Sequence, residues 1–288
     1  MDMLDFFNLH PSLLLIITAI LALFIGSFLN VVIYRLPRMM EQAWSEECRL
    51  YLGLKPHTEL EKFNLCLPFS HCPQCKKCIR PWHNLPLISY LWLRGHCAYC
   101  KAAISIRYPL VEALTCIASV LVIWQFGLTW QAVAALSFTW ISICLIFIDL
   151  DHHLLPDQLT LLLVWLALFF SLFNTFANSQ DAILGAIIGY LIFAITQWLF
   201  FKATGKIGMG QGDFKFLAGI GALLGWQMLP LIILLASISG ILFAFSHMLL
   251  KKQFKSVPLP FGPYLAVAGW IALLWGNEIM QKYFAVVL

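Results

Sequence analysis

Charged residues are scarce in this sequence. Only 11% of the 288 residues are Asp, Glu, Lys or Arg, whereas 61% are hydrophobic. Average soluble domains have about 25% charged residues, and the mean hydropathy here is +0.84. A chain with so little polar surface is not a water-soluble globule. The same composition excludes a disordered chain, collagen and a small disulfide scaffold.

Three further absences narrow the choice. The sequence has no repeat of solenoid length and no low-complexity tract. Its glycine-rich segment 208–213 reads G-x-G-x-G without a preceding strand, so the dinucleotide fingerprint fails, and no nucleic-acid partner is expected. The first apolar segment lacks a basic n-region and an A-x-A site, which predicts a retained anchor rather than a cleaved signal.

Long apolar runs dominate the rest of the chain. A transmembrane helix needs roughly 20 mostly apolar residues. The sequence contains about eight such segments, of which the sixth is short: 11–33, 108–126, 130–149, 158–176, 182–201, 214–227, 229–249 and 262–280. We therefore predict an all-α polytopic membrane protein with about eight transmembrane helices.

Basic residues set the expected orientation, because Lys and Arg are enriched in cytoplasmic loops. With eight spans, the basic residues of three regions all fall on one side of the membrane, and only Lys282 falls on the other. These regions are the polar insert (Arg35, Arg38 and Arg107), the loop between spans five and six (Lys202, Lys206 and Lys215) and the loop between spans seven and eight (Lys251, Lys252 and Lys255). This places the insert in the cytoplasm and both termini on the outer side of the membrane. The expected organisation is a first anchor at 1–34, a cytoplasmic insert at 35–107 and a transmembrane bundle at 108–288.

The insert contains two C-x2-C pairs, Cys72 with Cys75 and Cys97 with Cys100. Two such knuckles close a tetrahedron of thiolates around Zn²⁺, and four protein ligands indicate a structural zinc site. A small insert benefits from a metal because its own core is small. The cytoplasm is reducing, which favours metal binding over disulfides.

Other roles for these cysteines stay open, namely a redox dithiol and a disulfide pair. Cys78 lies close enough in sequence to compete as a ligand. The remaining nearby side chains are interpreted as incidental or supporting (Cys66, His71 and His96), and the other thiols as ordinary packing residues (Cys48, Cys116 and Cys144).

Ionisable residues at the ends of transmembrane spans are costly and therefore candidates for function. Asp149 ends the third span, and Asp213 follows the glycine-rich segment at the start of the sixth. The expected topology puts both at one membrane face. Two facing carboxylates titrate as a coupled pair in which one keeps its proton. The charged one can take a proton from water while the other hydrogen-bonds a scissile carbonyl, as in aspartic proteases. The glycines before Asp213 would let the backbone approach a substrate strand.

The other acids have alternative interpretations. Asp157 follows a proline and precedes an apolar run, as a helix N-cap does. Asp151 with His152 and His153 is either a metal site or a solvated turn. Glu112 is interpreted as a first-turn acid that the helix dipole favours. Asp213 is itself open to interpretation as only a cap.

Taken together, these motifs resemble the type IV prepilin peptidases, the bifunctional leader peptidase/N-methyltransferases of bacterial pilus and type II secretion systems. The resemblance covers nearly the whole chain. It rests on the two C-x2-C pairs and on seven further segments: GSFLN at 26–30, YRLP at 34–37, WHNLP at 82–86, LRG at 93–95, IRYPLVE at 106–112, the D-x-D segment at 149–157, and GQGD at 210–213.

The resemblance implies an aspartic endopeptidase at the cytoplasmic face of the bacterial inner membrane, embedded in lipid. Asp149 and Asp213 would form its catalytic pair, and zinc would bind the four cysteines. The substrates would be prepilins and pseudopilins with basic leaders. S-adenosylmethionine would donate a methyl group to the new amino-terminal residue, although no residues for binding it are identified.

Two other classes of protein remain. A presenilin-like intramembrane protease would share the two aspartates but has no need of the zinc knuckles. A transporter or membrane scaffold also tolerates intramembrane acids, but its spans should show paired halves or interrupted helices.

Overall fold

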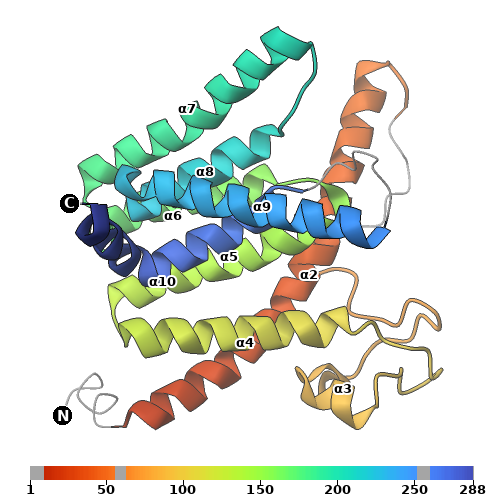
Figure 1. Ribbon diagram of the computed structural model, residues 1–288. Helices are drawn as coiled ribbons and strands as arrows, with labels where there is room; N and C mark the ends of the chain where they lie inside the picture. Colours follow the sequence, from red (N-terminus) through yellow and green to blue (C-terminus); the bar gives the residue numbers. More distant parts are fainter. Residues whose placement is uncertain (1–9, 56–62, 252–259, 288) are drawn as a thin grey trace. The chain divides into compact units, whose positions relative to one another are not determined.

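A computed structural model describes residues 10–55, 63–251 and 260–287 (Figure 1). The predicted cytoplasmic residues Lys252 and Lys255 lie outside these ranges. The chain divides into two compact units, Met1–Trp124 and Gln125–Leu288. The described residues form helices and turns with two isolated β-bridges, which confirms the predicted all-α fold.

The first unit is built on two long helices. Helix α2 (Pro11–Tyr51) has 41 residues, or about 60 Å at 1.5 Å per residue. This is twice the roughly 30 Å thickness of a hydrocarbon core. The helix therefore does not stop near residue 34, where the predicted anchor ends. It continues because the segment after Pro37 is rich in Met, Glu, Gln and Ala, which favour helix.

Helix α4 (Arg107–Phe126) packs closely against α2. A Cβ atom added to Gly26 would lie 2.8 Å from the Cα atom of Glu112, so only glycine permits this approach. Along the same contact, the Asn30 side chain donates to the carbonyl oxygen of Tyr108 at 3.1 Å. Further along α2, buried Arg35 donates to the carbonyl oxygen of Asn64 at 2.8 Å and so holds the insert to the helix.

The insert itself contains little regular structure. A 3₁₀ turn (Pro81–Asn84) and the short helix α3 (Ile88–Trp92) follow the first cysteine pair. Each cysteine pair lies beside one isolated antiparallel bridge, His71 with Cys78 and His96 with Ala103.

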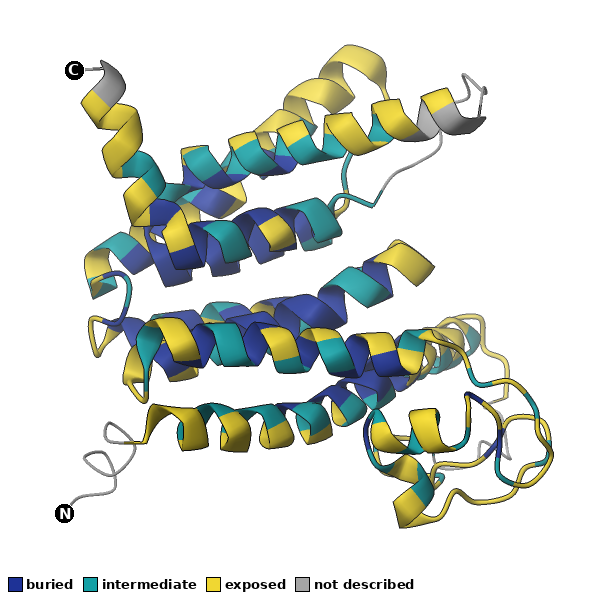
Figure 2. Ribbon diagram, turned by 60° about the horizontal axis from the view of Figure 1, so that its bottom comes forward, coloured by how far each residue is buried: buried dark blue, intermediate teal, exposed yellow. Residues whose placement is uncertain are grey.

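In the residues of the second unit that the structure describes, there are six α-helices. They are α5 (Trp130–His152), α6 (Asp157–Ser171), α7 (Ser179–Thr204), α8 (Gln211–Leu224), α9 (Leu229–Lys251) and α10 (Gly262–Val287). Helix α8 forms the centre, because every residue from 216 to 224 is buried. Buried residues concentrate on the inner faces of the helices (Figure 2).

Helices α7 and α8 pack backbone against backbone. A Cβ atom on Gly185 would lie 2.0 Å from the carbonyl oxygen of Gly221, and one on Gly189 would lie 2.8 Å from that of Leu217. Small residues let membrane helices approach in this way. The packing holds the amino-terminal end of α8, where Asp213 lies, in a fixed position.

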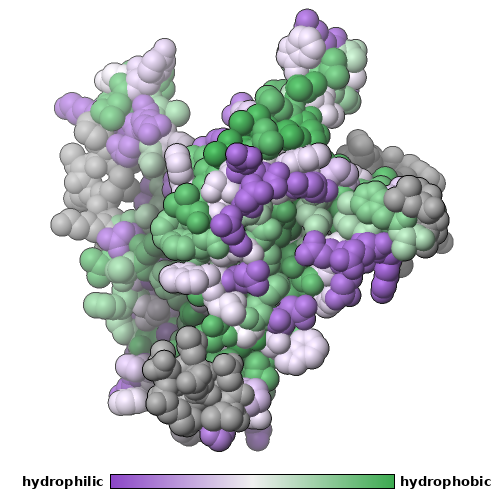
Figure 3. Space-filling view, turned by 90° about the vertical axis from the view of Figure 1, so that its left-hand side faces the viewer, coloured by the Kyte–Doolittle hydropathy of each residue, from purple (hydrophilic) through white to green (hydrophobic). Residues whose placement is uncertain are grey.

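Among the described residues, five helices are long and apolar enough to cross a membrane, by length and composition: α2, α4, α5, α7 and the segment Trp226–Ser246. Their outward faces carry large apolar side chains; Ile16, Ile20, Leu21 and Phe24 of α2 are each more than half exposed. Figure 3 shows hydrophobic side chains over much of one face. The chain is thus a polytopic membrane protein, and the count of eight spans stays a prediction. Helix α6 is shorter than the predicted segment 158–176, since it ends at Ser171.

Candidate catalytic aspartates and metal site

Asp149 lies in the last turn of α5 and is 5% exposed. The helix ends at His152, because His153 adopts a left-handed conformation (φ 51°) and donates its N–H to the carbonyl oxygen of Asp149 at 2.9 Å. Oδ2 of Asp149 accepts the N–H of Gly262, the first residue of α10, at 2.9 Å. The amino-terminal end of α10 therefore faces this carboxylate, an arrangement that favours negative charge.

Asp213 lies in the first turn of α8 and is 9% exposed. Its N–H donates to the carbonyl oxygen of Gly210 at 3.3 Å. Gly210 is the N-cap residue, so Asp213 does not cap the helix. Its carboxyl group lies close enough to Asp149 for the charges of the two side chains to interact.

Leu155 connects the surroundings of the two aspartates. A Cβ atom on Gly212, the neighbour of Asp213, would lie 2.6 Å from Cβ of Leu155. A Cβ atom on Gly262 would lie 3.0 Å from Cδ2 of Leu155 and 2.6 Å from Oδ2 of Asp149. Both glycines are therefore required by the packing of the protein itself. For Gly212 this differs from the expectation that its missing Cβ admits a substrate strand.

Three aromatic rings hold the same elements together. The ring of Phe193 on α7 lies 6.4 Å from that of Phe214, which follows Asp213. It also lies 5.8 Å from the ring of Phe261, which precedes Gly262. Edge-to-face contacts of this kind stabilise as well as orient their rings, so α7 positions the segments that carry both sides of the site.

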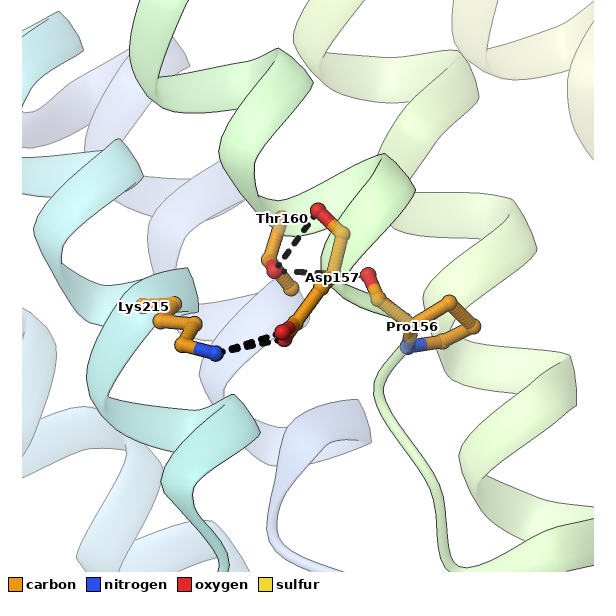
Figure 4. Close-up of polar contacts among 4 residues, drawn as sticks. All are labelled: Pro156, Asp157, Thr160 and Lys215. Carbon is orange, nitrogen blue, oxygen red and sulfur yellow. Dashed lines mark hydrogen bonds and ion pairs between the residues drawn. The ribbon is translucent and has the colours of Figure 1, made fainter. Parts of the chain in front are cut away.

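The structure separates the other acids from this pair. Asp157 is not an N-cap: Pro156 occupies that position, and Asp157 begins α6. Its two carboxylate oxygens each lie 2.7 Å from Nζ of Lys215 on α8 (Figure 4). This exposed ion pair joins α6 to α8. In the described part of the chain, Asp151, His152 and His153 do not form a group that could share a metal ion.

Glu112 has a different environment from the one expected. It lies beyond the first turn of α4 and is 8% exposed. Its Oε2 atom accepts the N–H of Leu87 at 2.8 Å, and Leu87 has a left-handed backbone (φ 56°). Glu112 therefore fixes the segment before α3 to the α2–α4 pair, which agrees with a structural role.

The four predicted metal ligands lie together in the first unit. The sulfur atoms of Cys72, Cys75, Cys97 and Cys100 are all within 4.8 Å of one another. The Cys72 and Cys100 sulfurs are 3.7 Å apart, and thiolates arranged tetrahedrally at about 2.3 Å from zinc are about 3.8 Å apart. All four are free thiols. Their arrangement therefore fits a closed zinc site.

The two cysteine pairs use the same backbone turn. The N–H of Cys72 donates to the carbonyl oxygen of Lys77. The carbonyl oxygen of Cys72 accepts the N–H of Lys76 at 2.9 Å, and Lys76 has a left-handed backbone. The second pair repeats this pattern with residues 97, 101 and 102. Cys78 lies outside the sulfur cluster and takes part in the bridge to His71.

Hydrogen bonding within these turns favours thiolates. Backbone N–H groups of Cys75 and Gln74 lower the pKa of Cys72 to about 6. Those of Cys100 and Tyr99 lower the pKa of Cys97 in the same way. A backbone hydrogen bond from Ala102 lowers the pKa of Cys100, but burial and the neighbouring sulfurs outweigh it and raise the value to about 11. Four thiolates this close need a cation to compensate their charge.

Several residues of the aspartate site escaped the sequence analysis. Phe261 and Leu155 lie in connections between the predicted apolar segments, Gly262 begins the last of these segments, and Phe193 lies inside one. Nothing in the local sequence indicates that the N–H of Gly262 faces Asp149.

Comparison with known proteins agrees with these features. Residues 20–126 match the family described as Bacterial Peptidase A24 N-terminal domain, and residues 136–245 match the Type IV leader peptidase family. The first match contains the four cysteines and the second contains both aspartates.

Three relatives are named prepilin leader peptidase/N-methyltransferase. The protein of Pseudomonas aeruginosa is 52% identical over 98% of both chains, and that of Aeromonas salmonicida is 49% identical over 96% of both. The protein of Legionella pneumophila is 42% identical over 95% of this chain and 96% of its own. No solved structure matches the chain significantly. These matches confirm the resemblance found in the motifs: the chain belongs to the type IV leader peptidase family.

Proposed function

We propose that this protein is a membrane-embedded aspartic endopeptidase that removes the basic leader of type IV prepilins and pseudopilins and then N-methylates the new amino terminus. The names of relatives that match almost the entire chain support both activities. The membrane helices support a substrate that is itself anchored in lipid.

One observation carries the proposal for the peptidase. Asp149 and Asp213 come from different helices, are both buried, and lie close enough to interact electrostatically. Burying two like charges together is costly. Ionisable residues in such surroundings cluster at functional sites. Around the two aspartates, Gly212 at the start of α8 and Gly262 at the start of α10 both pack against Leu155, which holds these two helix ends together.

The geometry suggests separate roles for the two carboxyl groups. Asp149 accepts the N–H of Gly262, so we assign it as the ionised member that takes a proton from the attacking water. Protonated Asp213 donates to the oxygen of the scissile carbonyl. When the tetrahedral intermediate collapses, the C–N bond breaks and the proton held by Asp149 passes to the leaving amine.

The proposed location follows from the distribution of charge. We propose that the aspartates and the insert lie at the cytoplasmic face of the bacterial inner membrane, with both termini in the periplasm; the basic residues of the loops support this orientation. Residues 1–34 would serve as the anchor, 35–107 as the zinc-binding insert and 108–288 as the protease bundle.

We further propose that Cys72, Cys75, Cys97 and Cys100 hold a structural Zn²⁺. The sulfur separations and the lowered pKa values of Cys72 and Cys97 support this ligand set. With four protein ligands, the metal would stabilise the insert and take no part in hydrolysis.

For the second activity, S-adenosylmethionine is the proposed methyl donor, as the N-methyltransferase in the relatives' name implies.

Mass spectrometry of a purified prepilin incubated with the enzyme tests both activities together. With S-adenosylmethionine, we expect a single cut before the apolar helix and one added methyl group on the new amino terminus. Without it, we expect the same cut and no methyl group.

The control is the Asp149→Asn variant, which should retain its place in the membrane and leave the prepilin intact. Cleavage deep within the apolar helix would favour a presenilin-like protease instead. No cleavage by the unchanged enzyme would contradict the proposal.

A further inference from the structure

A groove between α9 and α10 lies beside the candidate active site. It has a volume of about 370 Å³. Small or apolar side chains of α9 form one wall, including Ser237, Gly240 and Ile241, and Phe261 and Tyr264 form the other. The mechanism proposed above uses none of these side chains.

The groove is continuous with the catalytic machinery. Phe261 lines it, and the next residue, Gly262, donates its N–H to Asp149. Phe193 holds the ring of Phe261 from α7 at 5.8 Å. A group that lies in the groove therefore contacts Phe261, the residue next to the Gly262 N–H that binds the carboxylate of Asp149.

The wall on α9 suits a helix. A Cβ atom added to Gly240 would lie 3.5 Å from the ring of Tyr264, an ordinary contact distance, so the missing side chain leaves room between this glycine and the opposite wall. Gly240 and Ala244 are four residues apart on one face, the small-xxx-small spacing at which membrane helices approach closely. Ile241 beside them is 67% exposed.

The occupant has to be apolar. The segment Trp226–Ser246 is long and apolar enough to span a membrane, so the groove opens towards lipid. A lipid chain would fill such a groove without requiring small residues or a position next to Asp149. A substrate helix requires both, because its backbone must come close and its scissile bond must reach the aspartates.

We propose that this groove receives the apolar helix that follows the leader in the substrate and directs the scissile bond to Asp149 and Asp213. The proposal rests on the proposed peptidase function and assigns to it a docking surface for the substrate.

Site-specific photo-crosslinking tests the contact in full-length protein reconstituted into lipid vesicles. A benzoylphenylalanine would replace Ile241, which lines the groove, or Leu242, which does not; the two are 67% and 64% exposed. The Asp213→Asn background keeps the prepilin uncleaved. We expect an adduct with prepilin mainly from position 241. Equal yields from both positions, or adducts with lipid only, would overturn the proposal.

Blocking the groove gives a second measurement. Gly240→Trp should lower kcat/KM for prepilin by about tenfold or more, since it removes substrate binding that serves the transition state. Leu242→Trp should stay within about twofold. Unchanged cleavage by a folded Gly240→Trp variant would overturn the groove while leaving the peptidase function intact. Failure of the unsubstituted enzyme to cleave would instead contradict the function itself.

Discussion

The cysteine site and the aspartate site are built in opposite ways. Each cysteine pair sits in a turn whose hydrogen bonds join residues no more than five positions apart. Asp149 and Asp213 instead depend on α10 and on the connection before α6, and the bond from Gly262 to Asp149 joins residues 113 positions apart. A motif made of local turns is readable in sequence, whereas a site made of distant helix ends is not.

The two sites also differ in how their charge is compensated. The thiolates of the insert gather negative charge that a bound cation would neutralise. The aspartates gather negative charge in the bundle, where the compensation comes from one backbone N–H and the end of α10. We propose that the first arrangement stabilises a fold and that the second keeps two acids available for chemistry.

The largest expected effect concerns the aspartates. Asp149→Asn and Asp213→Asn should each lower kcat for leader cleavage by at least about a thousandfold, and the double variant should be no worse, because the pair acts as a unit. Single-turnover cleavage of prepilin in vesicles measures this. Asp151→Asn is the control with a milder effect. A variant at Asp151 as inactive as these would show that the pair is wrongly assigned.

A smaller effect is expected at Gly262. In Gly262→Ala the new Cβ would lie 2.6 Å from Oδ2 of Asp149, so the carboxylate must move. Displacement by about 1 Å can cost about a hundredfold in rate, and we expect kcat to fall by about that much. The matched control on the same helix is Gly276→Ala, whose Cβ would lie 3.2 Å from the flexible Met228 side chain and 3.7 Å from Cβ of Ala272. Equal kinetics for the two variants would contradict the role of Gly262.

The independence of the two sites can be tested by removing the metal. Cys72→Ser should abolish zinc binding, measured by elemental analysis, and speed hydrogen exchange throughout the insert. Because both aspartates lie in the second unit, we expect kcat to fall by less than about tenfold. Cys78→Ser should retain the metal, since Cys78 lies outside the sulfur cluster. Loss of zinc in this control would mean that the ligand set is wrong.

The smallest effect is expected at Asp157. Its ion pair with Lys215 is exposed, with side-chain exposures of 55% and 22%, and exposed pairs contribute about 1 kcal/mol or less. Asp157→Asn should lower the free energy of unfolding by no more than about that amount, and high salt should remove the difference. Thermal denaturation at two salt concentrations is the measurement. A loss of several kcal/mol would indicate that this pair has a larger role in joining α6 to α8.

Local patterns predicted the helices well, because apolar runs of sufficient length can be satisfied only as helices in a membrane. All eight predicted segments lie on helices, from α2 to α10. Errors occurred at boundaries. Helix α2 continues to Tyr51 because helix-favouring residues follow its apolar part, and α6 ends at Ser171 although apolar residues continue.

Side-chain roles were less predictable than helices. The N-cap assignment of Asp157 failed because Pro156 already occupies that position. The interpretation of Glu112 as a first-turn acid failed because α4 begins at Arg107 and the carboxylate binds Leu87. The contact between Glu112 and Leu87 joins segments that sequence spacing does not relate.

The sequence by itself determined the membrane class, the helical segments, the cysteine quartet and the two aspartates as candidates, since each depends on composition or on neighbouring residues. Only the tertiary structure decided which backbone group faces Asp149, which side chain fills the space beside Gly212, and where a groove adjoins the site. Those features depend on how the helices of the second unit pack, and packing is decided by surfaces formed from residues that are distant in the chain.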